Sequence, residues 1–126
     1  MKILIIDDDA DIRSIARLSL SRVGGMEVIE AGSGVEGVQK AQDELPDVIL
    51  LDMMMPTMDG LETLAALRSR PATASTPVIF LTAKALGDQL ERITSLGAAG
   101  VLIKPFDPRT LSRDVRALVN RPPKVE

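Results

Sequence analysis

Short apolar runs alternate along the chain with stretches in which apolar residues recur every three or four positions. Each run has the length of a buried strand, and we expect strands at 3–6, 26–31, 48–51, 78–81 and 101–103. The intervening stretches have the period of amphipathic helices, so their apolar residues are expected to face a core. Strands alternating with helices predict an α/β fold with a parallel sheet covered on both faces. The expected core-facing helix residues are Ile12, Ile15, Ala16, Leu20, Val23, Leu86, Leu90, Ile93, Leu111, Val115, Leu118 and Val119.

Capping residues and glycines support these helix boundaries. Two pairs have the spacing of a capping box, and one Asp-Pro pair is typical of an N-cap followed by proline at the first helical position. Glycines follow the ends of the first and fourth expected helices. The pairs are Ser33 with Glu36, Asp59 with Glu62, and Asp107 with Pro108, and the glycines are Gly24, Gly25 and Gly97.

The polarity of the strands indicates their order in the sheet. The runs at 3–6, 48–51 and 78–81 are almost wholly apolar, as expected of central strands buried on both faces, whereas the second run carries Glu27 and Glu30 and suits an edge. This favours the order 2-1-3-4-5. That order is taken from the known flavodoxin-like fold, a doubly wound five-stranded sheet in a three-layer α/β/α sandwich.

Length and composition bound the remaining possibilities. A chain of 126 residues, 45% hydrophobic, suits one compact domain, which we place at 1–121, followed by a tail at 122–126. The net charge of -3, the dispersed basic residues and an aromatic content of only two Phe argue against direct nucleic-acid binding. The chain has no Cys or His, which excludes disulfides, thiol catalysis and imidazole zinc sites. No run is long enough to span a membrane and none suits a signal peptide, so a cytoplasmic protein is expected.

Polar residues of a particular kind follow the strands that should be central. Asp7 and Asp8 follow the first strand, Asp52 the third, Thr82 the fourth and Lys104 the fifth. Ligands of open parallel sheets bind outside the carboxyl ends of the strands, near the point where strand order reverses. We therefore expect acids, a hydroxyl and an ammonium to converge on one small pocket.

Such a pocket suits phosphoryl chemistry on a metal ion. Crowded carboxylates raise one another's pKa, and a divalent cation such as Mg²⁺, which prefers oxygen ligands, relieves that repulsion. Asp52 could then attack a phosphoryl donor as a nucleophile. Lys104 would neutralise charge on the transferred group, and Thr82 would donate a hydrogen bond to one of its oxygens.

Taken singly, each of these residues has a plainer structural explanation. Asp9 and Asp11 suit N-capping of the first helix, and Asp52 alone suits a turn. Thr82 alone suits a strand and Lys104 a surface position. Their joint occurrence at strand ends is far more specific than any one of them. The methionines around the third strand end are expected to pack rather than bind metal; they are Met53, Met54, Met55 and Met58.

The stretches ILIIDDD, VILLDMMMPTMDG, VIFLTAKA and GAAGVLIKPF closely resemble the receiver domain of two-component response regulators, from residue 2 to about residue 120. The resemblance implies a CheY-like fold and a phosphorylation-controlled switch in a phosphorelay. It implies a histidine kinase or histidine phosphotransfer protein as donor and an unidentified effector protein downstream. It also implies a protein that assists its own phosphorylation and dephosphorylation but is not an enzyme with a separate substrate.

The resemblance assigns a role to each residue of the expected pocket. It makes Asp52 the phosphoacceptor, Thr82 the switch hydroxyl and Lys104 the lysine that contacts the phosphoryl group. The Lys104-Pro105 bond resembles one that is cis in the family, which would aim the lysine inward. Mg²⁺ is the implied cofactor, with Asp7, Asp8, Asp52 and the backbone carbonyl of Met54 as its implied ligands.

Two positions depart from the family pattern. Val101 replaces an aromatic residue that swings inward on activation, so signalling here is expected to depend on the loop after Thr82. Ala99 and Gly100 replace an acidic pair common in relatives fused to winged-helix domains. A homodimer through the face formed by the fourth helix, fifth strand and fifth helix therefore lacks the usual inter-subunit salt bridges, despite the arginines of the last helix, Arg113 and Arg116.

Two other functions fit part of the pattern. A haloacid-dehalogenase-like phosphohydrolase also uses an Asp nucleophile and Mg²⁺, but the acidic run 7–11 lacks the hydroxyl or β-branched residue that follows its D-x-D pair, and there is no cap domain. A degenerate receiver acting as a constitutive interaction module is the other alternative, although all the phosphorylation residues are present. Turnover of a phosphate ester would indicate the first, and failure to accept phosphate the second.

Overall fold

The structure, a computed structural model, describes residues 1–83 and 90–120. Five parallel strands form one sheet in the order β2-β1-β3-β4-β5, which confirms the expected order. Each begins and ends within one residue of its expected range, because turn and cap residues bound every apolar run. The strands are β1 (Lys2–Ile6), β2 (Glu27–Ala31), β3 (Val48–Asp52), β4 (Val78–Thr82) and β5 (Gly100–Ile103).

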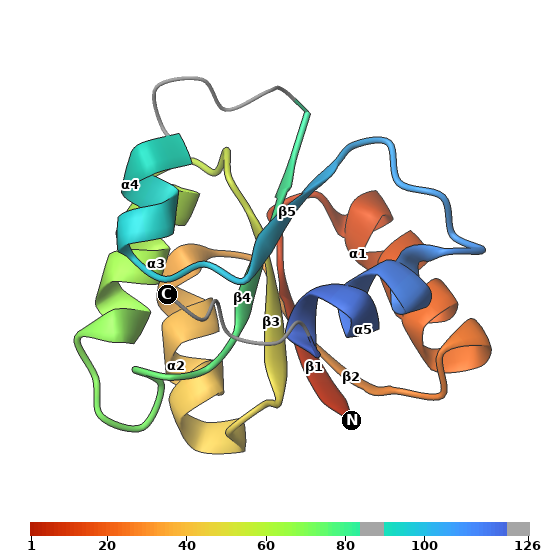
Figure 1. Ribbon diagram of the computed structural model, residues 1–126, viewed down its shortest axis with the longest axis horizontal. Coiled ribbons are helices and arrows are strands. Elements are labelled where there is room, and N and C mark those ends of the chain that lie inside the picture. Colours follow the sequence, from red (N-terminus) through yellow and green to blue (C-terminus); the bar gives the residue numbers. More distant parts are fainter. Residues whose placement is uncertain (84–89, 121–126) are drawn as a thin grey trace, which may run out of the picture.

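Helices cover both faces of the sheet, giving the expected three-layer sandwich (Figure 1). On one side lie α2 (Gly34–Glu44), α3 (Gly60–Arg68) and α4 (Leu90–Ser95). On the other side lie α5 (Leu111–Val119) and α1 (Ala10–Leu18), which continues into the π-helical segment η1 (Ser19–Val23). Within the described ranges, no helix has the length and apolar character needed to cross a bilayer.

Two apolar layers, one on each face of the sheet, hold the helices in place. One joins strand residues such as Leu51 and Phe80 to α2, α3 and α4, and the other joins Ile5 and Leu50 to α1 and α5. Every residue of β3 and β4 is buried, whereas β2 exposes Glu27 at the sheet's edge. The carboxyl ends of these buried, parallel central strands therefore lie at one edge of the sheet.

Two residues of the first expected helix were wrongly predicted to face the core. Ile15 is 44% exposed because α1 packs on the sheet through Ala16, and a residue one position earlier lies about 100° around the helix. Val23 is 60% exposed because the 3.6-residue period is lost in η1, where the Gly24 N–H donates to the Ser19 carbonyl five residues back. The glycines after η1 and α4 do end those helices: Gly25 and Gly97 have φ of 67° and 75°.

The capping predictions held to different degrees. The reciprocal box of Asp59 and Glu62 at the start of α3 is confirmed. At α2, Ser33 accepts from the Glu36 N–H as expected, but the Glu36 carboxylate accepts from the Gly32 N–H, so only half of the box forms.

The predicted start of the last helix at Pro108 is wrong. The carbonyl of Asp107 accepts from the N–H groups of both Thr110 and Leu111, so a separate turn precedes α5 and the helix begins at Leu111. The Asp107 side chain caps that turn through the Arg109 N–H. Leu86, the side chain of Leu90 and the tail predicted at 122–126 lie outside the described residues.

Candidate phosphoryl and metal site

The carboxyl ends of three central strands meet at one rim of the sheet. Asp7 follows β1, Asp52 ends β3 and Thr82 ends β4, and β3 lies between the other two. Lys104 directly follows β5 on the far side of β4, and its N–H donates to the Thr82 carbonyl at 2.7 Å. The sheet order itself therefore brings together residues separated by up to 97 positions in the sequence.

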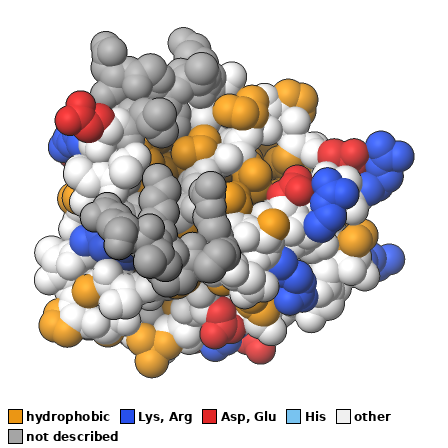
Figure 2. Space-filling view, viewed as in Figure 1, with side chains coloured by type: hydrophobic (Ala, Val, Ile, Leu, Met, Phe, Trp, Pro, Cys, Tyr) orange, Lys and Arg blue, Asp and Glu red, His pale blue; other side chains and the backbone are white. Residues whose placement is uncertain are grey.

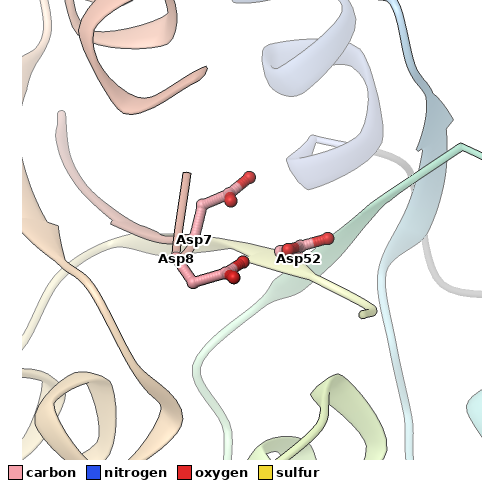
Figure 3. Close-up of side chains that lie close together, drawn as sticks. All are labelled: Asp7, Asp8 and Asp52. Atoms are coloured by element: carbon pink, nitrogen blue, oxygen red, sulfur yellow. The ribbon is translucent and has the colours of Figure 1, made fainter. Parts of the chain in front are cut away.

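Three carboxylates form a compact cluster at this rim. Oxygen atoms of Asp7, Asp8 and Asp52 all lie within 4.8 Å of one another, and Figure 3 shows the side chains extending into the same space. Asp7 and Asp52 are 1% and 5% exposed, whereas Asp8 is exposed. The three acids converge as the sequence predicted, and the structure adds that two of them are buried and one is open to solvent.

Lys104 supplies the positive charge that this cluster needs. Its Nζ atom lies 3.2 Å from Asp7 Oδ2 and 3.3 Å from Asp52 Oδ1. Burial disfavours its charge, but the two carboxylates outweigh burial and raise the pKa of Lys104. The Lys104-Pro105 peptide bond is cis, as the resemblance implied. Lys104 is therefore a fixed cation shared by two acids.

Asp52 has a strongly altered acidity. Burial of its carboxyl group and repulsion from the neighbouring Asp7 raise the pKa of Asp52 to about 6, against the opposing attraction of Lys104. The Met54 N–H donates to Asp52 Oδ1 at 3.3 Å, which also favours the ionised form. The single positive charge of Lys104 does not neutralise the three carboxylates, and a divalent cation could neutralise the remaining negative charge.

Of the other acids in the opening run, Asp9 has the capping role that the plainer explanation predicted, whereas Asp11 lies in the first turn of α1 and is not its N-cap. Asp9 is the N-cap of α1 and accepts from the N–H groups of Asp11 and Ile12 at 2.9 and 3.3 Å. The Asp9 N–H in turn donates to Asp7 Oδ1 at 2.9 Å. The cap of α1 therefore holds one buried acid of the cluster in position.

Sequence reasoning missed the contribution of Arg13. Its Nη1 donates to the Asp7 carbonyl at 2.7 Å, and its Nε pairs with Glu30 Oε1 at 3.3 Å. Arg17 binds the same carboxylate at 2.7 Å. The signal was available in the strand order, because β2 lies beside β1 and the register pairs Ile5 with Glu30, close to Asp7. Arg13 therefore links the carboxyl end of β1 to the edge strand β2 through one hydrogen bond and one ion pair.

The structure places the remaining predicted residues as follows. Thr82 is 3% exposed at the end of β4, beside the strand that carries Asp52. Met53 and Met55 are buried in the core, as expected of packing residues, and Met58 is partly buried. The prediction that Met54 packs is wrong, because its side chain is 72% exposed in the loop after β3.

One broad face of the molecule carries charges of both signs. On the face shown in Figure 2, acidic and basic side chains are interspersed, mainly over the side where α1 and α5 lie. Local ion pairs among the charged residues of the chain include Arg109 with Asp107 at 3.1 Å. On this face, the described residues present no extended basic stripe of the kind that binds a nucleic-acid backbone.

Known proteins resemble this chain in both sequence and fold. A family model of the response regulator receiver domain matches residues 3–116. The chain is 41% identical over 122 residues to the probable transcriptional regulator ycf27 of Guillardia theta, covering 95% of this chain and 46% of that protein. It is also 41% identical to the transcriptional regulatory protein CpxR of Escherichia coli, covering 95% and 50%.

Solved structures agree with the sequence comparison. The chemotaxis protein CheY4 of Vibrio cholerae superposes with a TM-score of 0.87 at 35% identity, covering 93% of this chain and 97% of that chain. The chain spans about half the length of the curated relatives it matches, and nearly all of the chemotaxis protein.

Proposed function

This chain belongs to the response regulator receiver domain family of two-component signalling, and on that premise we propose that Asp52 accepts a phosphoryl group from a histidine kinase or histidine phosphotransfer protein. The observation that carries the proposal is the setting of Asp52, a buried carboxylate 3.3 Å from Lys104 and within 4.8 Å of two other acids. The receiver is a signalling module that assists its own phosphorylation and has no separate substrate.

The proposed transfer is a displacement at phosphorus. An Asp52 carboxylate oxygen attacks the phosphorus atom of a phosphohistidine, a P–O bond forms and the donor's P–N bond breaks. The bonding pair stays on the imidazole nitrogen, which takes up a proton from solvent. The attacking carboxyl must be ionised, and with a pKa of about 6 it is largely so above pH 7. The product is an acyl phosphate on Asp52.

The donor set of the cluster fits Mg²⁺, which prefers several oxygen ligands and retains some of its water. Asp7, Asp8 and Asp52 offer oxygens within 4.8 Å of one another, and the backbone carbonyl of Met54 would complete the protein ligands. When bound, the ion supplies positive charge that stabilises the transferring phosphoryl oxygens. The residual repulsion that raises the pKa of Asp52 is the feature such an ion would relieve.

Lys104 and Thr82 would act on the phosphoryl group once it arrives. Lys104 lies 3.3 Å from Asp52 Oδ1, so its ammonium group can contact a phosphoryl oxygen on that atom. Thr82 ends the neighbouring strand, and its hydroxyl group would hydrogen-bond a second oxygen. The phosphoryl group carries a charge of roughly -1.5 to -2 at neutral pH in place of the single charge of the carboxylate, and it adds several strong hydrogen-bond acceptors. This change is large enough to shift an equilibrium between two conformations that differ by a few kcal/mol.

The output surface would be the face formed by α4, β5 and α5, read by an effector protein or by a second copy of the chain. Val101, partly buried against the α4 side of the core, takes the place of a rotating aromatic side chain. The loop after Thr82, on which signalling was expected to depend, lies outside the described residues from 84 to 89. Ala99 and Gly100 leave any homodimer through this face without the acidic partners used by many relatives.

The proposal is tested by incubating the protein with acetyl phosphate and Mg²⁺ and measuring its intact mass. We expect one phosphoryl adduct, absent in Asp52→Asn and absent when a chelator removes Mg²⁺. The matched control is Asp43→Asn, which changes an exposed carboxylate in the last turn of α2 and should leave the adduct intact. An unmodified wild-type protein, under conditions that modify a known receiver, would contradict the proposal.

The same samples distinguish the alternative functions. A phosphohydrolase would turn over p-nitrophenyl phosphate repeatedly, whereas a receiver should release no more than a trace of nitrophenol. A degenerate receiver would neither accumulate the adduct nor turn over the ester.

A further inference from the structure

The methionines of this chain differ widely in exposure, and the most exposed one adjoins the phosphoacceptor. Met54 is 72% exposed, while Met53 and Met55 on either side are 3% and 8% exposed. Met26 is also buried, at 4%, and Met1 is 39% exposed at the opposite end of β1 from the site. Met58, further along the same loop, is intermediate in exposure. Met54 is therefore the most accessible thioether near the site, and its two neighbours in the chain are buried.

The backbone of Met54 also hydrogen-bonds the carboxylate that the proposed function phosphorylates. Its backbone N–H donates to Asp52 Oδ1 at 3.3 Å. Its thioether sulfur is thus no more than one side-chain length from the backbone that contacts the acceptor carboxylate. The buried side chains of Met53 and Met55 hold the loop in the core on both sides of it.

Hydrogen peroxide converts such an exposed thioether into a sulfoxide. One peroxide oxygen forms a bond to sulfur, the O–O bond breaks and water leaves, so the sulfur is oxidised by two electrons and the peroxide is reduced. The product is polar and chiral, and its oxygen carries partial negative charge. That oxygen would lie within one side-chain length of the backbone group that contacts the Asp52 carboxylate, near charges that are already negative.

We infer that Met54 is an oxidation site through which peroxide lowers the rate of phosphoryl transfer to Asp52, an inference that rests on the proposed function. The buried neighbours are protected from the oxidant, so the modification is selective without unfolding the core. Methionine sulfoxide reductases restore the thioether, with a dithiol oxidised to a disulfide and the oxygen released as water. The receiver would therefore respond to peroxide reversibly, independently of its kinase.

The experiment compares phosphorylation of treated and untreated protein. Wild type is exposed to limiting hydrogen peroxide, the excess is removed, and oxidation is located by peptide mass spectrometry. The initial rate of adduct formation from acetyl phosphate and Mg²⁺ is then measured, before and after treatment with both reductases and dithiothreitol. Met54→Leu conserves volume but has no sulfur to oxidise, and Met58→Leu is the matched control in the same loop. Each variant is compared with its own untreated sample.

We expect sulfoxide at Met54 before Met53, Met55 or Met26, and a fall in initial rate of roughly twofold, the effect of one partial charge at a water-accessible site. The reductases should restore the rate, Met54→Leu should lose the sensitivity and Met58→Leu should keep it. The inference is overturned if the buried methionines oxidise first, if Met54 sulfoxide leaves the rate unchanged, or if Met54→Leu is inhibited as strongly as wild type. Failure of the untreated protein to accept phosphate would instead overturn the proposed function, and this inference with it.

Discussion

Replacing the acceptor Asp52 with Asn should stabilise the metal-free protein at neutral pH. In the folded protein, burial and the neighbouring Asp7 raise the pKa of Asp52 from 3.8 to about 6. The ionised carboxylate is therefore less stable in the fold than in the unfolded chain. Asn has nearly the same shape and hydrogen-bonding capacity but no charge, so it mimics the protonated acid at every pH.

The sign and the pH window follow from the two pKa values. The folded-state pKa of Asp52 is the higher one, so between pH 3.8 and about 6 the folded protein binds a proton on Asp52 that the unfolded chain does not. The free energy of unfolding therefore falls as pH rises through that interval. Integrating this linkage gives a cost of about 1.5 kcal/mol at pH 5 and about 3 kcal/mol at pH 7.5. Asp52→Asn should regain those amounts, since it carries no such charge.

Urea unfolding at pH 5 and pH 7.5, with chelator present to exclude metal ions, measures the effect. With an m-value of about 2 kcal/mol/M, the unfolding midpoint of Asp52→Asn should lie about 1.5 M above that of wild type at pH 7.5, and about half as far above it at pH 5. Asp43→Asn controls for removing an exposed charge and should shift the midpoint little at either pH. A destabilised Asp52→Asn, or a shift independent of pH, would refute the reasoning.

Three further predictions test other parts of the site. Lys104→Met leaves Asp7 and Asp52 without their shared cation, so the pH above which Mg²⁺ binds, measured by calorimetry, should rise relative to wild type; an unchanged pH profile would mean that the lysine does not lower the pKa of Asp52. Gly60→Ala places a methyl group 2.7 Å from the Asp52 carbonyl and 2.8 Å from Met53 Cα, both backbone atoms, so urea unfolding should show a loss of roughly 2 kcal/mol or more, whereas a neutral result would show that the loop can move. Asp59→Ala removes the cap of α3 and should cost about 1 kcal/mol in the same assay without abolishing phosphorylation, and complete loss of the adduct would contradict its purely structural role.

The fold and the main site were predictable because each depends on a local pattern combined with one general rule. Apolar runs bounded by polar residues identified the strands, and the rule that parallel strands present their carboxyl ends at one rim brought Asp7, Asp52 and Lys104 together. The order of the strands was the essential step. It was taken from a known fold, because the polarity of β2 alone identifies an edge but not the whole sequence of neighbours.

The features that the sequence reasoning did not predict depend on local hydrogen bonds that several conformations of the same residues could make. The helical period gave no sign that η1 widens after Leu18, so Val23 was wrongly assigned to the core. The Asp-Pro pair before α5 marks a turn as well as it marks a helix start, and only the hydrogen bonds of the folded chain distinguish them. Arg13 acts on Asp7 across the junction of α1 and β1, a contact that helical spacing does not reveal.

The most direct test of the central claim is to locate the phosphoryl group. Borohydride reduces an acyl phosphate to an alcohol, so treating the phosphorylated protein and sequencing its peptides by mass spectrometry identifies the modified acid. The account predicts that reduction occurs at Asp52 alone, and only in samples phosphorylated with Mg²⁺ present. Reduction at Asp7, Asp8 or any other acid, with Asp52 intact, would contradict it.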